Sequence, residues 1–178
     1  MTRRGLYSFL FSIYNIAHIP APRGLLADKE RHAAMDENNV IISIRGIQSA
    51  PQQPDDVIEL VTEGKLVHDG DGAFTLSYQE SEVTGMEGTL TTFQIERERI
   101  TLMRLGEFSS QMVFEPGRRH LSMYNTPYGA LSVGVNTRSM SADVDSRGGQ
   151  ISIAYDIEID HAVAGVNQFE IQIREARK

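Results

Sequence analysis

Cysteine is absent from all 178 residues, and this excludes several kinds of site. The chain can form no disulfide, hold no zinc–thiolate or iron–sulfur centre and use no thiol nucleophile. A chain without cysteine suits a reducing compartment, so we expect a cytoplasmic protein. Tryptophan is absent as well, so the Cys–Trp–Cys core typical of an immunoglobulin domain is missing.

Basic residues are the minority, with 17 Lys and Arg against 24 Asp and Glu and a net charge of −7. A surface with this excess of negative charge repels nucleic acid and anionic lipid, so we expect neither DNA nor a membrane as a partner. The motifs of nucleophile elbows, Walker loops, His-Glu-x-x-His metalloproteases and Rossmann domains are also absent. We therefore expect no metal and no cofactor.

The first 34 residues lack the regular patterning of the rest. Arg3 and Arg4 make a basic start, and a mostly apolar run follows over 6–19. One interpretation is that translation begins at Met35, so that residues 1–34 lie upstream of the true start or are disordered. A secretory signal and a genuine ordered or amphipathic extension are the alternatives, although the run has a poor cleavage site and is shorter than the roughly 20 residues that span a bilayer. Residues 35–178 form the expected domain.

From Asn39 onward, apolar residues recur with a period of two, which indicates β-strands. The clearest strand runs over 151–159, where isoleucines and one tyrosine alternate with polar residues. In 131–144 the apolar parity shifts towards the end, which predicts a β-bulge. Gly-rich and Pro-Gly segments at 69–72 and 116–117 predict turns.

About nine such strands follow one another through short turns, with no convincing helix between them. Short turns join antiparallel neighbours. The alternation indicates a sheet with one buried face and one wet face. A sheet this long must close into a barrel or split into a sandwich, and consecutive hairpins favour an up-and-down barrel.

Several short motifs stand out in the second half of the chain: Gly85-Met86-Glu87-Gly88-Thr89, Arg104-Leu105-Gly106, the segments 112–118 and 124–129, and Gly149 with its following strand. Through these motifs the chain resembles the YwiB-like family, a bacterial domain of unknown function, over about residues 38–176. The resemblance implies an all-β, antiparallel, calycin-like (lipocalin-like) barrel of about 8–10 strands. It implies no activity and transfers no catalytic residue, and residues 1–34 depart from the family pattern.

A cluster of cations after the Pro-Gly turn is the most unusual local feature. Arginine offers a rigid fork for carboxylate or phosphate, and a turn offers free backbone N–H groups. One hypothesis is therefore an anion-binding rim at a barrel mouth; the alternative is a solvated turn whose arginines pair with acids such as Glu115. The candidate ligand-binding residues here are Arg118, Arg119 and His120, with Tyr124 and Tyr128 close behind.

Arg104 is the second candidate ligand-binding residue. It shares strand parity with Ile100 and Leu102. If that face is internal, a guanidinium points into the barrel and needs a partner, which Glu80 or Glu87 could supply. If the opposite parity is internal, Arg104 lies on the surface.

The sequence favours a non-catalytic barrel that binds a small molecule or an anion. An isomerase or hydrolase with its site in the barrel mouth is an alternative, with Arg104, His120 and Tyr124 as its acid–base set. A barrel with a filled interior that acts through a protein partner, as in a homodimer, is the third.

Overall fold

Ten strands and one short 3-10 helix make up the computed structural model, which describes residues 36–49, 54–106, 110–126, 129–159 and 161–176. The interpretations of residues 1–34 therefore lie outside the described residues and stay predictions. The helix, η1 (Glu82–Thr84), lies between the third and fourth strands. The strands are β1 (Asp36–Ser49), β2 (Asp56–Gly70), β3 (Ala73–Gln79), β4 (Leu90–Ile95), β5 (Ile100–Leu105), β6 (Ser110–Phe114), β7 (Arg119–Thr126), β8 (Gly129–Asp145), β9 (Gly148–Ile159) and β10 (Ala162–Glu175).

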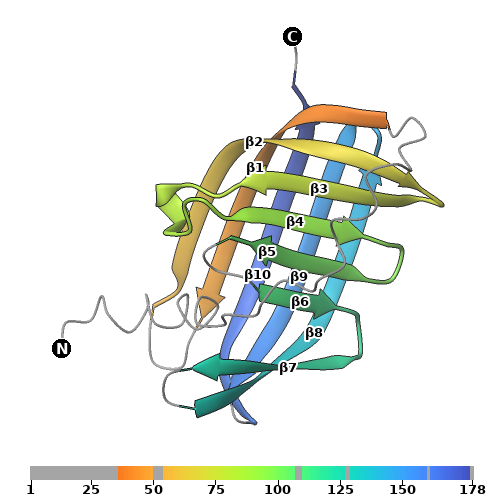
Figure 1. The fold of residues 1–178 in the computed structure, drawn as a ribbon. Helices are drawn as coiled ribbons and strands as arrows, with labels where there is room; N and C mark the ends of the chain where they lie inside the picture. Colours follow the sequence, from red (N-terminus) through yellow and green to blue (C-terminus); the bar gives the residue numbers. More distant parts are fainter. Residues whose placement is uncertain (1–35, 50–53, 107–109, 127–128, 160, 177–178) are drawn as a thin grey trace.

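All ten strands belong to one antiparallel sheet in the order β6-β5-β4-β3-β2-β1-β10-β9-β8-β7. Each strand pairs with the next one along the chain except at the step from β6 to β7, and β1 pairs with β10. The sheet curls round until its two edge strands approach each other (Figure 1). The predicted antiparallel up-and-down barrel is thus confirmed, with the two sheet edges at β6 and β7.

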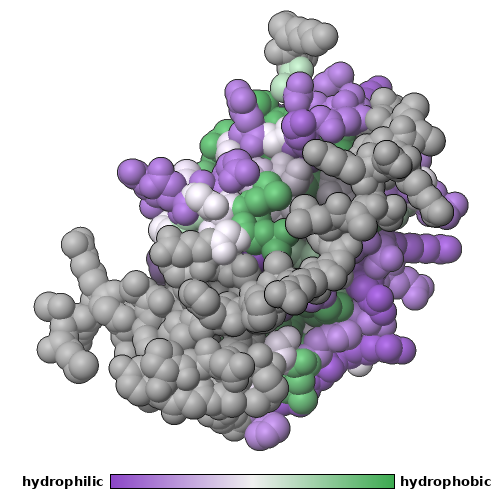
Figure 2. All heavy atoms as spheres, in the orientation of Figure 1, coloured by the Kyte–Doolittle hydropathy of each residue, from purple (hydrophilic) through white to green (hydrophobic). Residues whose placement is uncertain are grey.

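The apolar residues of the alternating strands point into the barrel and form its core. In β9, Ile151, Ile153, Tyr155 and Ile157 are all buried, as the period-two pattern predicts. The Tyr155 ring lies 4.9 Å from the ring of Phe114, which extends the core across the barrel. Among the coloured residues of Figure 2, hydrophilic side chains cover more of the visible surface than hydrophobic ones.

The predicted bulge lies in the middle of β8. The pairing of β8 with β9 shifts register between Thr137 and Ser139. Val133, Val135 and Thr137 are buried before the shift, and Met140 packs against the core after it. The extra residue therefore changes the parity of β8 without removing its apolar residues from the core.

The two edge strands, β6 and β7, meet at a seam, and no backbone ladder joins them in the part of the chain that the structure describes. The backbone N–H of Glu115, just after β6, donates a hydrogen bond of 3.1 Å to Oγ1 of Thr137 in β8. A contact that involves a side chain thus links the end of β6 to β8, the strand next to the edge strand β7.

Up-and-down topology places alternate connections at the two ends of the barrel. The β1–β2, β3–β4 and β5–β6 connections lie at one end, which we call the η1 end because it holds that helix. The β2–β3, β4–β5, β6–β7 and β8–β9 connections lie at the opposite end. Within the described ranges, no helix is long and apolar enough to cross a membrane.

Candidate functional site

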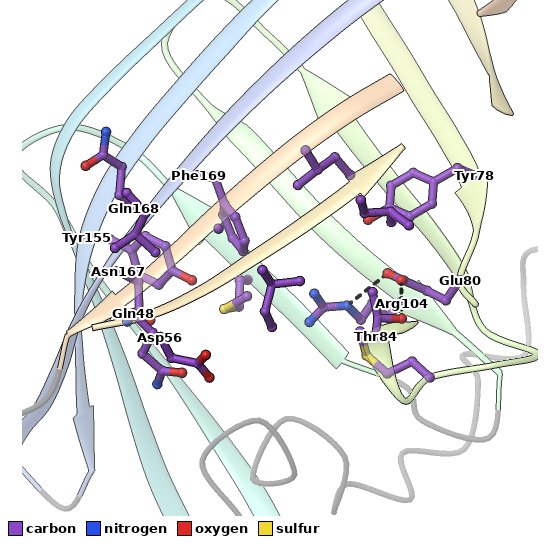
Figure 3. Close-up of a pocket in the computed structure, with 17 residues that line it drawn as sticks. Gln48, Asp56, Tyr78, Glu80, Thr84, Arg104, Tyr155, Asn167, Gln168 and Phe169 are labelled. Carbon is purple, nitrogen blue, oxygen red and sulfur yellow. Dashed lines mark hydrogen bonds and ion pairs between the residues drawn. The ribbon is translucent and has the colours of Figure 1, made fainter. Parts of the chain in front are cut away.

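A cavity of about 70 Å³, partly open to solvent, lies inside the barrel towards the η1 end. Strands from both halves of the chain and the β3–β4 connection form its wall (Figure 3). Most of the wall is apolar, and a few polar groups interrupt it. Its main apolar residues are Ile44, Ile58, Leu60, Met86, Met112 and Phe169.

Glu80 is the most deeply buried charged group on the cavity wall, with a side chain only 1% exposed. It follows Leu76 and Tyr78 in inward parity, one residue past the end of β3. The Oγ1 of Thr91 donates a 2.5 Å hydrogen bond to one carboxylate oxygen. The Oγ1 of Thr84, which η1 folds back towards the strand, donates a 2.8 Å bond to the other. Both oxygens of this buried carboxylate are therefore hydrogen-bonded, as a buried charge requires.

Arg104 faces Glu80 from β5, with 3.9 Å between its Nε and Oε1 of Glu80. Ile100, Leu102 and Arg104 all point inward, so the guanidinium is buried and its side chain is 8% exposed. Of the two positions considered for Arg104 from the sequence, inside the barrel or on its surface, the internal one is correct. Glu80 is the acid that pairs with Arg104, whereas Glu87 is exposed.

Tyr78 lies beside this pair on β3 and is also buried on the cavity wall. Burial raises the pKa of its phenol well above the usual value near 10, and the negative charge of Glu80 raises it further. The phenol therefore stays protonated and supplies a hydroxyl rather than a charge. The cavity wall here consists of one ion pair and one neutral phenol.

The cationic cluster lies at the opposite end of the barrel from this cavity. Arg118 is exposed on the β6–β7 turn and pairs with Glu115 at 3.0 Å. The Nε2 of His120 lies 3.3 Å from the same carboxylate. Arg119 pairs with Glu158 at 2.6 Å. These are the ion pairs that the solvated-turn alternative foresaw, and local acids balance the charge of the cluster.

The remaining candidates add little to a shared site. Tyr124 lies in β7, but its side chain is not among those described, and Tyr128 lies outside the described residues. Arg104 pairs with Ser110 at the start of β6, whereas His120 lies beyond the other end of that strand. At about 3.4 Å per residue, β6 alone separates them by about 14 Å. The structure thus does not bring Arg104 and His120 into one acid–base set.

Sequence reasoning gave little attention to several cavity residues that parity could have found. Glu80 continues the inward series of Leu76 and Tyr78, and Asn167 continues the series of Ile171 and Phe169 in β10. The inward position of both residues therefore follows from the two-residue periodicity of a strand, once the inward face is known. Across the described ranges, no group of three His, Cys, Asp or Glu residues could hold a metal ion.

Three comparisons relate the chain to known proteins. It is 30% identical over 84 residues to the uncharacterized beta-barrel protein YwiB of Bacillus subtilis, a match that spans 47% of this chain and only 58% of the relative. The crystal structure of the YwiB protein superimposes with a TM-score of 0.68 at 23% identity and covers 81% of this chain and 96% of the other, which shows a common fold. The model of a family described as a domain of unknown function (DUF1934) matches residues 42–171. The chain belongs to this family of uncharacterised β-barrel proteins.

Proposed function

We propose that this protein is a non-catalytic barrel that binds a small, mostly apolar molecule in its interior cavity. The observation that carries the proposal is a mainly apolar cavity, partly open to solvent, with a single buried ion pair on its wall. Small-molecule sites combine an apolar lining with a few placed polar groups in this way. The calycin-like character implied by the resemblance would suit such a role and stays a prediction.

The size of the cavity limits the ligand. Its volume of about 70 Å³ lies far below the roughly 300–1,000 Å³ that is usual for drug-sized ligands. We therefore expect a short molecule of a few carbon atoms.

The charge of the wall limits the ligand's polar group. Glu80 balances Arg104, so the pair brings no net charge to the cavity. Moving an ion into such surroundings carries a large desolvation cost, whereas a neutral group loses much less. An amide or a hydroxyl, which can accept from a guanidinium and donate to a carboxylate, suits this pair better than an anion does.

Ligand-observed NMR on the full chain, with short-chain amides and alcohols as probes, tests the proposal. Ile58 lines the cavity, so Ile58→Phe should fill it and abolish the binding seen with the parent protein. Val57 is 45% exposed on the other face of the same strand, so Val57→Phe is the matched control and should bind as the parent does. The proposal fails if no probe binds, or if Ile58→Phe binds as well as Val57→Phe.

A further inference from the structure

A second group of polar side chains lies on the cavity wall, away from the ion pair. Asp56 pairs with Gln48, Gln48 with Asn167, and Asn167 with Tyr155 in the registers of four neighbouring strands. All four residues line the cavity, so they form one row across β2, β1, β10 and β9, which we call the polar row. In Figure 3 the polar row lies on the opposite side of the cavity from Glu80 and Arg104.

Asn167 is the most informative member of the polar row. It is 8% exposed, and its Nδ2 is buried with no hydrogen-bond partner in the part of the chain that the structure describes. A buried amide nitrogen without an acceptor lowers stability, and an apolar side chain of similar size would remove that cost. A donor that faces a cavity in this state is suited to an acceptor supplied by a bound molecule.

The neighbours of Asn167 indicate the charge of that acceptor. Asp56, two positions away in the polar row, places a carboxylate at the same side of the cavity. The carboxylate of Asp56 would repel a carboxylate on the ligand, whereas it would not repel a ketone or amide carbonyl. Between the polar row and the ion pair, the wall is formed by apolar side chains that include Phe169.

We infer that the ligand is a short, uncharged molecule with an apolar middle and polar groups at both ends, one of them a carbonyl that accepts a hydrogen bond from Nδ2 of Asn167. This inference rests on the proposed function, because it specifies the ligand of the same cavity. It adds a second recognition point, 24 residues or more from Glu80 and Arg104 in sequence and on a different part of the sheet.

Calorimetric titration with two matched probes tests the inference. Valeramide carries one amide on an apolar chain, and levulinamide is the same chain with a ketone added. The parent protein should bind levulinamide about 10-fold more tightly, the gain expected when a buried donor obtains its acceptor. Asn167→Leu should abolish this preference while valeramide still binds.

Gln172→Leu is the matched control, since it replaces an exposed amide at a position of the same strand that faces away from the cavity. It should keep the preference for levulinamide. Asn167→Leu should also melt at the same temperature as the parent or higher, because it removes an unsatisfied donor. A clear fall in its melting temperature would show that Asn167 has a structural partner and would overturn the inference.

Asn167→Asp is the second variant. It keeps the size and shape of the side chain, so it tests the inference even if Asn167→Leu fails to fold. Its carboxylate offers no donor, so the preference for levulinamide should vanish here too; a preference that survives overturns the inference. If both probes bind the parent equally, the inference fails while the proposed function stands. If neither probe nor any other short-chain amide or alcohol binds, the proposed function itself fails.

Discussion

Glu80 and Arg104 form a buried ion pair that lies both in the core of the barrel and on the wall of the cavity. Two threonine hydroxyls, from Thr84 and Thr91, hold the Glu80 carboxylate, so its position does not depend on the arginine alone. The contact with Arg104 is long, at 3.9 Å. A buried ion pair of this kind adds little to stability over apolar residues, but either charge left alone is costly. Its place on the cavity wall, rather than its contribution to folding, sets it apart from the surrounding core.

Replacing Glu80 with alanine should lower the free energy of unfolding by about 3 kcal/mol, because the Arg104 charge then stays buried without its acid. The double variant Glu80→Met with Arg104→Met should recover most of this loss. Urea unfolding followed by circular dichroism measures both. Glu82→Ala, at an exposed position of η1, is the control and should change the free energy of unfolding by less than about 0.5 kcal/mol. A double variant no more stable than Glu80→Ala would contradict this account.

Gly106 allows two short sequence motifs to pack against each other. Its φ is +156°, and an added Cβ would lie 2.8 Å from the carbonyl oxygen of Gly88 and 2.9 Å from Cα of Thr89. Only glycine allows the end of β5 to pass so close to the β3–β4 connection. The segments Gly85–Thr89 and Arg104–Gly106, separate in sequence, therefore form one packed unit that holds Glu80 and Arg104 at the cavity.

At the scale of the strand, Glu115 makes the contacts described beside the β6–β7 seam. The backbone N–H of Glu115 bonds to Thr137, while the Glu115 carboxylate meets Arg118 and His120. Exposed ion pairs contribute little, so the buried hydroxyl of Thr137, 3% exposed, is the more important link.

Thr137→Val should therefore lower the free energy of unfolding by about 1–2 kcal/mol, since it keeps the shape of the side chain but removes the acceptor for the Glu115 N–H. Thr92→Val, at a half-buried position of β4, is the matched control and should change it by less than about 0.5 kcal/mol. Denaturant unfolding of both variants makes the comparison. Equal losses in the two would show that the hydrogen bond at the seam is not what matters.

Most strands were readable from the sequence because they alternate over their own length. The isoleucines of β9 and the shifted parity of β8 needed no partner strand to interpret. The ion pair was harder, since β5 carries apolar residues in both parities and only the sheet decides that Arg104 points inward. The polar row could not be predicted at all, because it exists only in the registers between four strands. The cationic cluster and its neighbour Glu115 were visible, but Glu158, which pairs with Arg119, comes from a distant strand, β9.

For the whole molecule, the topology predicts an uneven resistance to local opening. Strands β1, β9 and β10 pair on both sides, whereas β6 and β7 each pair on one side. Amide hydrogen exchange of the native protein should therefore be slowest in the central strands and fastest, among the strands, in β6 and β7. Exchange measured by mass spectrometry on peptic fragments checks this order. Protection of β6 equal to that of β1 would mean that the barrel is closed at the seam in solution.

Because the sheet edges lie at β6 and β7, the strands follow the chain order round the sheet but start at β7 instead of β1. β1 and β10 lie next to each other, and the N–H of Ala176 bonds to the carbonyl of Asn39 at 2.9 Å, so the two ends of the barrel domain meet. If a linker joined these ends and the chain were cut in the turn between β6 and β7, the result would be a simple meander from β7 through β10 and β1 to β6. Every ladder would survive, and the new termini would emerge at the end of the barrel away from the cavity. The domain is thus a natural candidate for circular permutation, with tags or fused partners attached where they cannot obstruct a ligand.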